Sequence, residues 1–249
     1  MDRFAARSQH GGVRPATLFR NANADRQAKE IGMDINNQDT AVVITDPQND
    51  FLSEQGAAWP LVQEGVRENN TIENIEKVFV AARDRGFKVF ISPHYYFPYD
   101  REWKFGGTIE KKMHEIQMYE RKAPLDLDGF EGSGADWLER YKPLINADNV
   151  VITSPHKIMG PETNDLALQL RKHGYKKVIL AGMSANLCIE AHMRELIEQG
   201  FEVAVVKDAT AAGRDPELGD GYEAALVNFR YIANAVLSTE EATQAMSTG

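Results

Sequence analysis

The 249-residue chain contains a single cysteine, Cys188, at a point where a predicted strand gives way to a helix. The apolar run 178–181 is typical of a buried strand, Gly182 ends it, and an amphipathic segment begins near Asn186. A thiol in the first turn of a helix feels the positive end of the helix dipole and nearby unpaired N–H groups, and both favour the nucleophilic thiolate. A lone cysteine is more often a small buried apolar residue, so other residues must support a catalytic role.

Polar residues that could assist a thiol follow other predicted strands. Asp46 comes directly after the first apolar run, and Lys157 lies four residues past the third. A carboxylate can take the thiol proton and return it to a leaving amine, while a lysine can stabilise the ionised groups. The backbone N–H groups of Ser184 and Cys188, at the turn into the helix, can hold an oxyanion. Together these residues predict nucleophilic attack on an amide.

The elements that must position these residues follow from the hydrophobic pattern. Apolar runs predict six strands, at 41–45, 87–91, 149–153, 177–181, 202–206 and 233–237. Helical spacing predicts intervening or terminal helices at 67–85, 164–173, 186–199, 218–231 and 239–246. Apolar strands that alternate with helices form parallel sheets covered on both faces. We therefore predict an α/β, Rossmann-like, doubly wound sheet, mainly parallel and six-stranded, with its active site at the carboxyl ends of the strands.

Length and composition predict one large domain rather than several. Residues 1–38 are polar and rich in arginine and are interpreted as an N-terminal arm, followed by a catalytic domain over 39–249 with a helix and loop insertion at about 97–147. The formal net charge of −9 provides no basic surface for nucleic acid or anionic lipid. A single cysteine needs no oxidising compartment, and no apolar run reaches transmembrane length. We expect a cytoplasmic protein that binds neither nucleic acid nor membranes.

Three segments resemble motifs of the isochorismatase-like cysteine hydrolases, a family that includes nicotinamidases, N-carbamoylsarcosine amidase and ureidoacrylate amidase. Residues 46–51, Asp-Pro-Gln-Asn-Asp-Phe, resemble the family's D-x-Q-N-D-F opening. Residues 182–189, Gly-Met-Ser-Ala-Asn-Leu-Cys-Ile, resemble its G-V-x-T-N-x-C-V nucleophile segment, and 207–211 resemble its D-A-T/C-A segment. The resemblance covers about residues 38–240. It implies a Rossmann-like sheet and an Asp–Lys–Cys triad.

On this resemblance Asp46 is the base, Cys188 is the nucleophile, and a cis peptide bond joins Met183–Ser184. The family's lysine directly ends its strand, whereas Lys157 comes a few residues later in this chain. Lys157 remains the best match for the third triad position, and His156 is an alternative.

Aromatic residues and a histidine near the predicted strand ends and in the insertion are expected to contact the substrate: Phe51, His94, Tyr95, Tyr96 and Trp103. Nicotinamidases of the family place Asp and His metal ligands just after the second strand. This chain has His94 there but no carboxylate before Asp100, and its other histidines show no ligand spacing. We therefore expect neither a metal ion nor another cofactor.

These observations predict a cysteine hydrolase that cleaves a linear C–N bond in a small amide, ureido or carbamoyl compound through a thioester-type intermediate. The alternatives are vinyl ether hydrolysis, as in isochorismatases proper, and a catalytically silent scaffold of the same fold. A nucleotide-binding module is disfavoured because residues 46–50 contain no glycine-rich phosphate turn. Sheets of this kind often pair, so a homo-oligomer, either dimer or tetramer, is expected.

Overall fold

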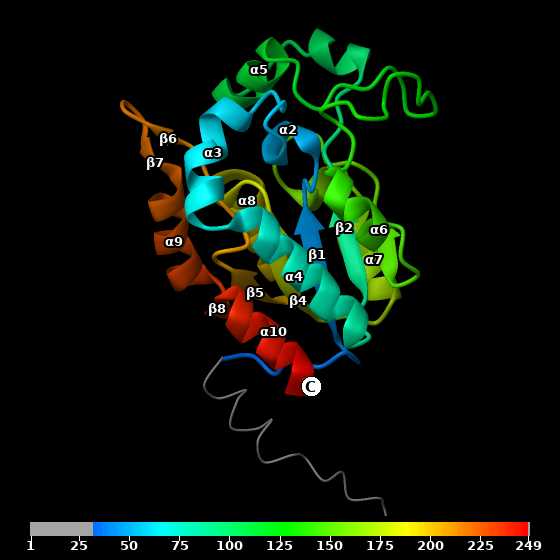
Figure 1. The fold of residues 1–249 in the computed structure, drawn as a ribbon, viewed down its shortest axis with the longest axis vertical. Coiled ribbons are helices and arrows are strands. Elements are labelled where there is room, and N and C mark those ends of the chain that lie inside the picture. Colours follow the sequence, from blue (N-terminus) through cyan, green and yellow to red (C-terminus); the bar gives the residue numbers. More distant parts are fainter. Residues whose placement is uncertain (1–31, 249) are drawn as a thin grey trace, which may run out of the picture.

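The central sheet of the computed structural model, which describes residues 32–248, has six parallel strands in the order β3-β2-β1-β4-β5-β8 (Figure 1). They are β1 (Thr40–Thr45), β2 (Val89–Ser92), β3 (Val150–Ile152), β4 (Lys177–Gly182), β5 (Glu202–Val206) and β8 (Ala235–Leu237). Each predicted strand is present within a few residues of its expected bounds, and the predicted doubly wound α/β sheet is confirmed. The chain order reverses between β1 and β4, which makes this the switch point where ligands of such sheets bind.

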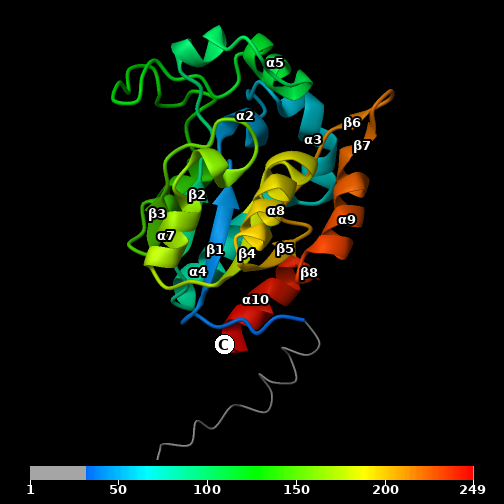
Figure 2. The ribbon, with the colours of Figure 1, turned by 180° about the vertical axis from the view of Figure 1, so that it is seen from behind.

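Helices cover both faces of the sheet because side chains of successive strand residues point to opposite faces. In β1, Val42 and Ile44 pack into one hydrophobic cluster, and Ala41 and Val43 pack into the other. The first face is covered by helices α3 (Trp59–Glu68), α4 (Thr71–Asp84) and α10 (Thr239–Thr248). Figure 2 shows the opposite face, covered by α7 (Leu166–Lys172), α8 (Glu190–Glu198) and α9 (Gly221–Ile232).

Local backbone conformation divides two of the predicted helices. The helix expected over 67–85 starts only at Thr71, as α4, because residues 67–68 are the end of α3, most of which was not predicted, and Asn70, a left-handed residue with φ of 50°, separates the two helices. The helix expected over 186–199 begins with a π-helical turn, Ala185–Ile189, before α8. Hydrophobic spacing does not reveal such breaks, since the apolar positions continue across them.

Several short elements complete the described chain. They are α2 (Asn49–Leu52), α5 (Thr108–Glu115), α6 (Lys142–Ile145), an antiparallel hairpin of β6 (Arg214–Asp215) and β7 (Gly219–Asp220), and 3₁₀ turns at Pro98–Glu102, Glu139–Tyr141 and Pro161–Thr163. The hairpin and α2 lack a hydrophobic period long enough to be predicted from sequence.

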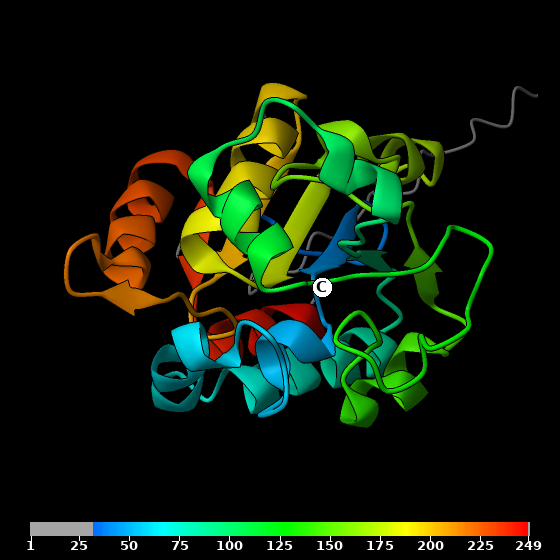
Figure 3. The ribbon, with the colours of Figure 1, turned by 90° about the horizontal axis from the view of Figure 1, so that it is seen from above.

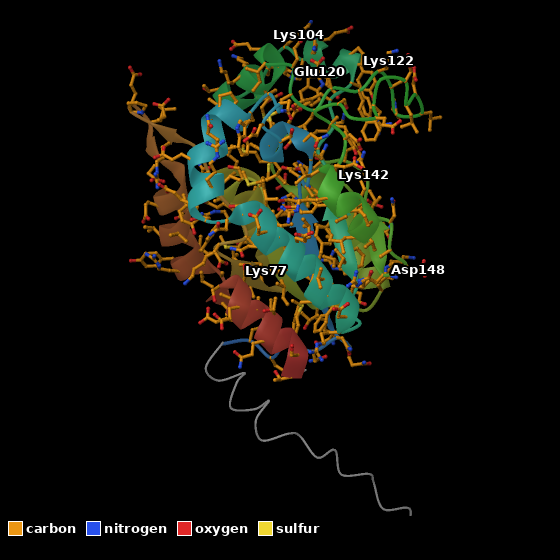
Figure 4. The ribbon with its side chains drawn as sticks, in the orientation of Figure 1. Lys77, Lys104, Glu120, Lys122, Lys142 and Asp148 are labelled. Carbon is orange, nitrogen blue, oxygen red and sulfur yellow. The ribbon has the colours of Figure 1, made fainter. Side chains whose placement is uncertain are left out.

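The insertion at about 97–147 lies over the carboxyl edge of the sheet. Viewed from above that edge, its green segments cross over the strands (Figure 3). Its charged side chains Lys104, Glu120 and Lys122 lie at the outer rim of the molecule (Figure 4). The insertion thus covers the strand ends with its inner side and presents charge on its outer side.

Most of the predicted N-terminal arm, residues 1–31, lies outside the described residues. Of the remainder, Met33 and Ile35 are buried in the main hydrophobic cluster. This part of the arm therefore contributes to the core. Over residues 32–248, none of the helices combines the length and the apolar character needed to span a membrane.

Candidate active site

Asp46 and Cys188 meet where the central strands β1 and β4 end. Thr45 and Gly182 are paired at the last position of the two strands, so the residues that follow them start side by side. Asp46 adopts a left-handed conformation with φ of 48°, and its side chain is completely buried. The cysteine Sγ and a carboxylate oxygen of Asp46 lie within 4.8 Å of each other. The structure therefore brings together the two residues on which the sequence prediction depends most.

The turn between β4 and Cys188 has the backbone that the family resemblance implied. Gly182 has φ of 119°, and a Cβ atom at this position would lie 2.1 Å from the carbonyl oxygen of Thr45. The predicted cis peptide bond is present between Met183 and Ser184. The backbone N–H groups of Ser184 and Cys188 lie near the Cys188 sulfur and act to lower the pKa of its thiol. Two amide donors thus converge on the atom beside which an oxyanion would form.

The Cys188 thiol is not the preformed thiolate that the helix position suggested. Burial, followed by the negative charge of Asp46, raises its pKa well above the ordinary value. The two N–H donors lower the pKa, but their effect is smaller. The expectation of a thiolate was wrong because it considered the helix end and not the burial of the sulfur or the carboxylate beside it. At neutral pH the resting group is a thiol.

The raised thiol pKa predicts an unusual alkylation profile. Native Cys188 should react slowly with iodoacetamide at neutral pH and should need a higher pH than an ordinary thiol to react fast, because only the thiolate is alkylated and the pKa of this thiol is raised. Asp46→Asn removes the charge that raises the pKa, so the rate profile should move to lower pH. Peptide mass spectrometry of initial rates would measure both profiles, with denatured protein as the reference. Identical profiles for the two native proteins would contradict this account of the thiol.

His156, and not Lys157, contacts the predicted base. Its Nε2 lies 2.9 Å from Oδ1 of Asp46, and both side chains are completely buried. The ammonium group of Lys157 instead donates to the carbonyl oxygen of Tyr95 at 2.9 Å and to Asp100 Oδ2 at 2.5 Å. The structure therefore does not place Lys157 in the expected position beside Asp46, and the alternative residue occupies it.

The strand register explains why His156, and not Lys157, faces Asp46. Within the sheet Ile91 pairs with Ile152, but past the strand ends His94 pairs with His156, so the β3 side contains one extra residue. Paired residues on adjacent strands point to the same face, which directs His156 toward His94. Lys157 points the opposite way, and its ammonium group lies 4.0 Å from the centre of the Phe97 ring.

His94 borders the site as a neutral imidazole. Burial, and then the proximity of His156, lowers its pKa well below the ordinary value. Its Nε2 is 3.1 Å from the carbonyl oxygen of Lys157, while its Nδ1 has no hydrogen-bond partner in the described part of the chain. Its ring centre is 4.5 Å from that of His156 and 4.9 Å from that of Tyr119. His94 therefore presents a free ring nitrogen beside the candidate triad.

His192 supports the site from the helix that follows Cys188. Its Nδ1 is 2.7 Å from the carbonyl oxygen of Cys188, and its Nε2 is 2.8 Å from Oγ of Ser92. Its ring also meets that of His156 edge-on at 5.1 Å. The sequence analysis gave His192 no role, although its i, i+4 spacing from Cys188 on a helix was a usable signal.

Of the aromatic residues predicted to contact the substrate, Tyr96 and Phe51 pack against residues of the site, whereas Tyr95 and Trp103 lie farther from it. Tyr96 stands 4.6 Å from His94 between ring centres, and Phe51 meets Tyr119 edge-on at 5.8 Å. Tyr95 instead packs away from His94, with its ring centre 6.0 Å from that of Phe130 and 6.3 Å from that of Trp137. Trp103 is 40% exposed and reaches the site only through the edge of Tyr96.

Tyr119 is a site residue that the sequence analysis missed. Its side chain is completely buried, and its hydroxyl has no hydrogen-bond partner within the residues that the structure describes. Burial, followed by the charges of Asp46 and Cys188, raises its pKa. It has φ of 58°, and its backbone N–H donates to Asp50 at 2.6 Å. It belongs to the insertion, where no motif or regular spacing points to it.

The site also brings together a set of potential metal ligands. Among residues 32–248, one ligand atom from each of Asp46, His94, His156 and Cys188 lies within 4.8 Å of all the others. Spacing along the sequence predicted no such set, because the four residues follow four different strands. The spacing along the sequence therefore missed a candidate ligand set that the fold brings together.

Comparison with known sequences shows the relationships of the chain. The isochorismatase domain model matches residues 40–241. The ureidoacrylate amidohydrolase RutB of Serratia proteamaculans is 26% identical over 181 residues, covering 70% of each chain. An uncharacterised isochorismatase family protein of Bacillus subtilis, YddQ, is 27% identical over 114 residues, which is 45% of this chain. The match spans 62% of the length of that relative.

Solved structures share the fold at lower identity. A cysteine hydrolase from Pseudomonas syringae superimposes with a TM-score of 0.70 and 22% identity, covering 86% of this chain and 95% of the other. Nicotinamidase PncA from Bacillus subtilis superimposes with a TM-score of 0.57 and 21% identity, covering 80% and 99%. The domain match covers most of the chain and includes both strands whose ends carry Asp46 and Cys188, so this protein belongs to the isochorismatase-like hydrolase family.

Proposed function

We propose that the protein is an amidohydrolase that cleaves a linear C–N bond in a small amide, ureido or carbamoyl compound. The observation that carries this proposal is the convergence of the Cys188 thiol, the Asp46 carboxylate and two backbone N–H donors at one buried point. Similarity to ureidoacrylate amidohydrolases supports the reaction class. A thiol nucleophile also suits an amide carbonyl, which it can attack to form a thioester.

In the proposed reaction, Asp46 transfers the protons. Its Oδ2, which has no hydrogen-bond partner over residues 32–248, takes the thiol proton as the sulfur bonds to the carbonyl carbon. The N–H groups of Ser184 and Cys188 hold the resulting oxyanion. The C–N bond then breaks, and Asp46 gives the proton to the leaving amine. Asp46 next takes a proton from water, whose oxygen attacks the thioester. When the C–S bond breaks, the proton returns to sulfur and the acid is released.

His156 takes the third position of the triad in this proposal. Its Nε2–H donates to Asp46 Oδ1, which fixes the carboxylate and leaves Oδ2 for the thiol. The proposed role is positional and electrostatic, and it replaces the lysine that the family resemblance implied. Lys157 pairs with Asp100 on the other side of the strand.

The substrate in this proposal is small and has both hydrogen-bond donors and acceptors. Cys188 is only 2% exposed, so a bulky substrate has little access to its sulfur. The free Nδ1 of His94 can accept a hydrogen bond from a substrate N–H group, and the free hydroxyl of Tyr119 can donate one to an oxygen. Two free groups of this kind match a ureido or carbamoyl compound better than a purely apolar amide.

A hydrolysis screen tests the reaction class. Purified protein would be incubated with small amides, ureido acids, carbamoyl compounds and vinyl ethers, and the release of ammonia or amine would be measured. We expect amine release from at least one C–N class. Cleavage of vinyl ethers alone, or no turnover of any class, would contradict the proposal in favour of the isochorismatase-type reaction or the silent scaffold respectively.

Substituting the two neighbours His156 and Lys157 separates catalytic positioning from structural support. His156→Gln should lower kcat by about tenfold or more, because Asp46 loses the ring that orients it as a base. Lys157→Met should leave kcat nearly unchanged but lower the free energy of unfolding by about 1–3 kcal/mol, since the buried carboxylate of Asp100 loses its cation.

The measurements are steady-state kinetics and urea unfolding for both variants. Each variant serves as the control for the other, because the positions are adjacent in sequence. A large loss of kcat in Lys157→Met with normal activity in His156→Gln would restore the lysine to the triad.

A further inference from the structure

The buried cluster of Asp46, His94, His156 and Cys188 has nearly the dimensions of a metal site. The four candidate ligand atoms all lie within 4.8 Å of one another. Tetrahedral zinc, with bonds of about 2.0–2.3 Å, holds its ligand atoms about 3.3–3.7 Å apart. A pair of ligand atoms at the longest separation, 4.8 Å, would therefore need to close by about 1.1–1.5 Å, which is within the reach of side-chain rotation.

Unpartnered atoms in the cluster point to a missing ligand. Asp46 Oδ2, His94 Nδ1 and His156 Nδ1 are all buried and have no hydrogen-bond partner among residues 32–248. Buried polar atoms are nearly always paired, so three such atoms in one cluster favour a bound group at this place. His94 is also oriented as a metal-bound histidine usually is, because its Nε2 is held by the Lys157 carbonyl oxygen while Nδ1 keeps its lone pair free.

We propose that these four side chains bind one divalent transition metal ion, with Zn²⁺ as the best match. A thiolate sulfur, two imidazole nitrogens and a carboxylate oxygen form a borderline-soft set of four that suits tetrahedral zinc. The charges also match, because one thiolate and one carboxylate neutralise the two charges of the ion in a fully buried place. Binding replaces the S–H bond with an S–Zn bond, and the proton leaves to solvent.

The bound ion would prevent the proposed amide hydrolysis, and this consequence rests on the proposed function. Cys188 could not attack a carbonyl while its sulfur is coordinated, and Asp46 could not accept a proton through a coordinated oxygen. Metal binding and nucleophilic attack would therefore exclude each other at the same four residues. A metal ion bound at this site would therefore inhibit the hydrolase reversibly.

Cobalt(II) is a suitable probe because it occupies zinc sites and absorbs visible light. Reduced protein, first treated with chelator and then freed of it, would be titrated with Co²⁺ and then with Zn²⁺. We expect one Co²⁺ per chain, a thiolate-to-cobalt charge-transfer band, and displacement by one equivalent of Zn²⁺. Cys188→Ser should abolish the band. His94→Gln should weaken binding by at least about tenfold, whereas His173→Gln, at an exposed histidine, should not change it.

The blocking effect can be measured without a substrate. Zn²⁺ should protect Cys188 from iodoacetamide, and chelator should restore labelling. A spectrum without a charge-transfer band, or metal binding equal in the wild type, Cys188→Ser and His94→Gln, would overturn the site. If Cys188 is alkylated as fast in zinc-loaded protein as in metal-free protein, the proposed inhibition by metal is contradicted. Failure of the hydrolysis screen would not change these spectra, so the metal site and the proposed function fail separately.

Discussion

Replacing Cys188 with alanine should abolish turnover while leaving the fold intact. No other described residue offers a thiol, and in the proposed mechanism the covalent intermediate forms on this sulfur. Loss of a nucleophile from a catalytic triad lowers kcat by up to about 10⁶-fold. The substitution removes a single buried sulfur atom and leaves only a small cavity. The loss in the free energy of unfolding should therefore be about 1–2 kcal/mol or less.

Testing Cys188→Ala requires measuring both its turnover and its stability against the wild type. kcat would be measured on the best substrate from the screen, and thermal unfolding would be followed by circular dichroism. Cys188→Ser is the matched variant, since it keeps a polar atom at the site but is a far weaker nucleophile. Turnover near the wild-type level in either variant would show that Cys188 is a structural residue.

Replacing Asp46 with asparagine should lower kcat by at least about a hundredfold, the usual scale for the loss of a general base. Asparagine keeps the shape of the side chain and can still accept the hydrogen bond from His156. It cannot take the thiol proton, and it cannot protonate the leaving amine. The same variant should alkylate at lower pH than the wild type, so turnover and thiol reactivity should change in opposite directions.

Asp208→Asn provides the matched control. Asp208 also follows a central strand, but its Oδ1 accepts hydrogen bonds from the backbone N–H and the hydroxyl of Thr239 at the start of α10. Asparagine retains that oxygen, so kcat should be unchanged. Near-normal turnover in Asp46→Asn would mean that another group moves the protons.

The sheet could be predicted because its strands are short, apolar and separated by helices. Runs such as 41–45 and 177–181 are buried on both faces of the sheet. Such continuous apolar runs can be recognised as strands without knowing which strands they pair with. The placement of Asp46 and Cys188 followed, since residues after neighbouring parallel strands must meet at one edge. The local turn was also predictable, because the family resemblance implied its cis bond.

The third triad position could not be predicted in the same way. Whether residue 156 or 157 faces Asp46 depends on one extra residue between Ile152 and His156, and the sequence does not reveal the pairing across the strand ends. Tyr119 was missed for a related reason, because a long insertion folds back over the sheet and brings distant residues to the site.

The state of the thiol was also beyond the sequence. A helix start favours a thiolate, but the fully buried sulfur lies beside a carboxylate, and these two effects outweigh the amide donors. Such a balance depends on distances that only the folded chain defines. It also suits the proposed chemistry, since a protonated thiol beside a base can be activated when the substrate is in place.

The central claim is that hydrolysis passes through a covalent adduct on Cys188. The most direct measurement is mass spectrometry of the protein, acid-quenched at early times after mixing with a substrate from the screen, followed by peptide mapping. The account predicts that wild-type protein gains the mass of the acyl or carbamoyl fragment on the peptide containing Cys188, and that this adduct forms and decays at rates consistent with turnover. Turnover with no adduct at any time, or with an adduct on another residue, would contradict it.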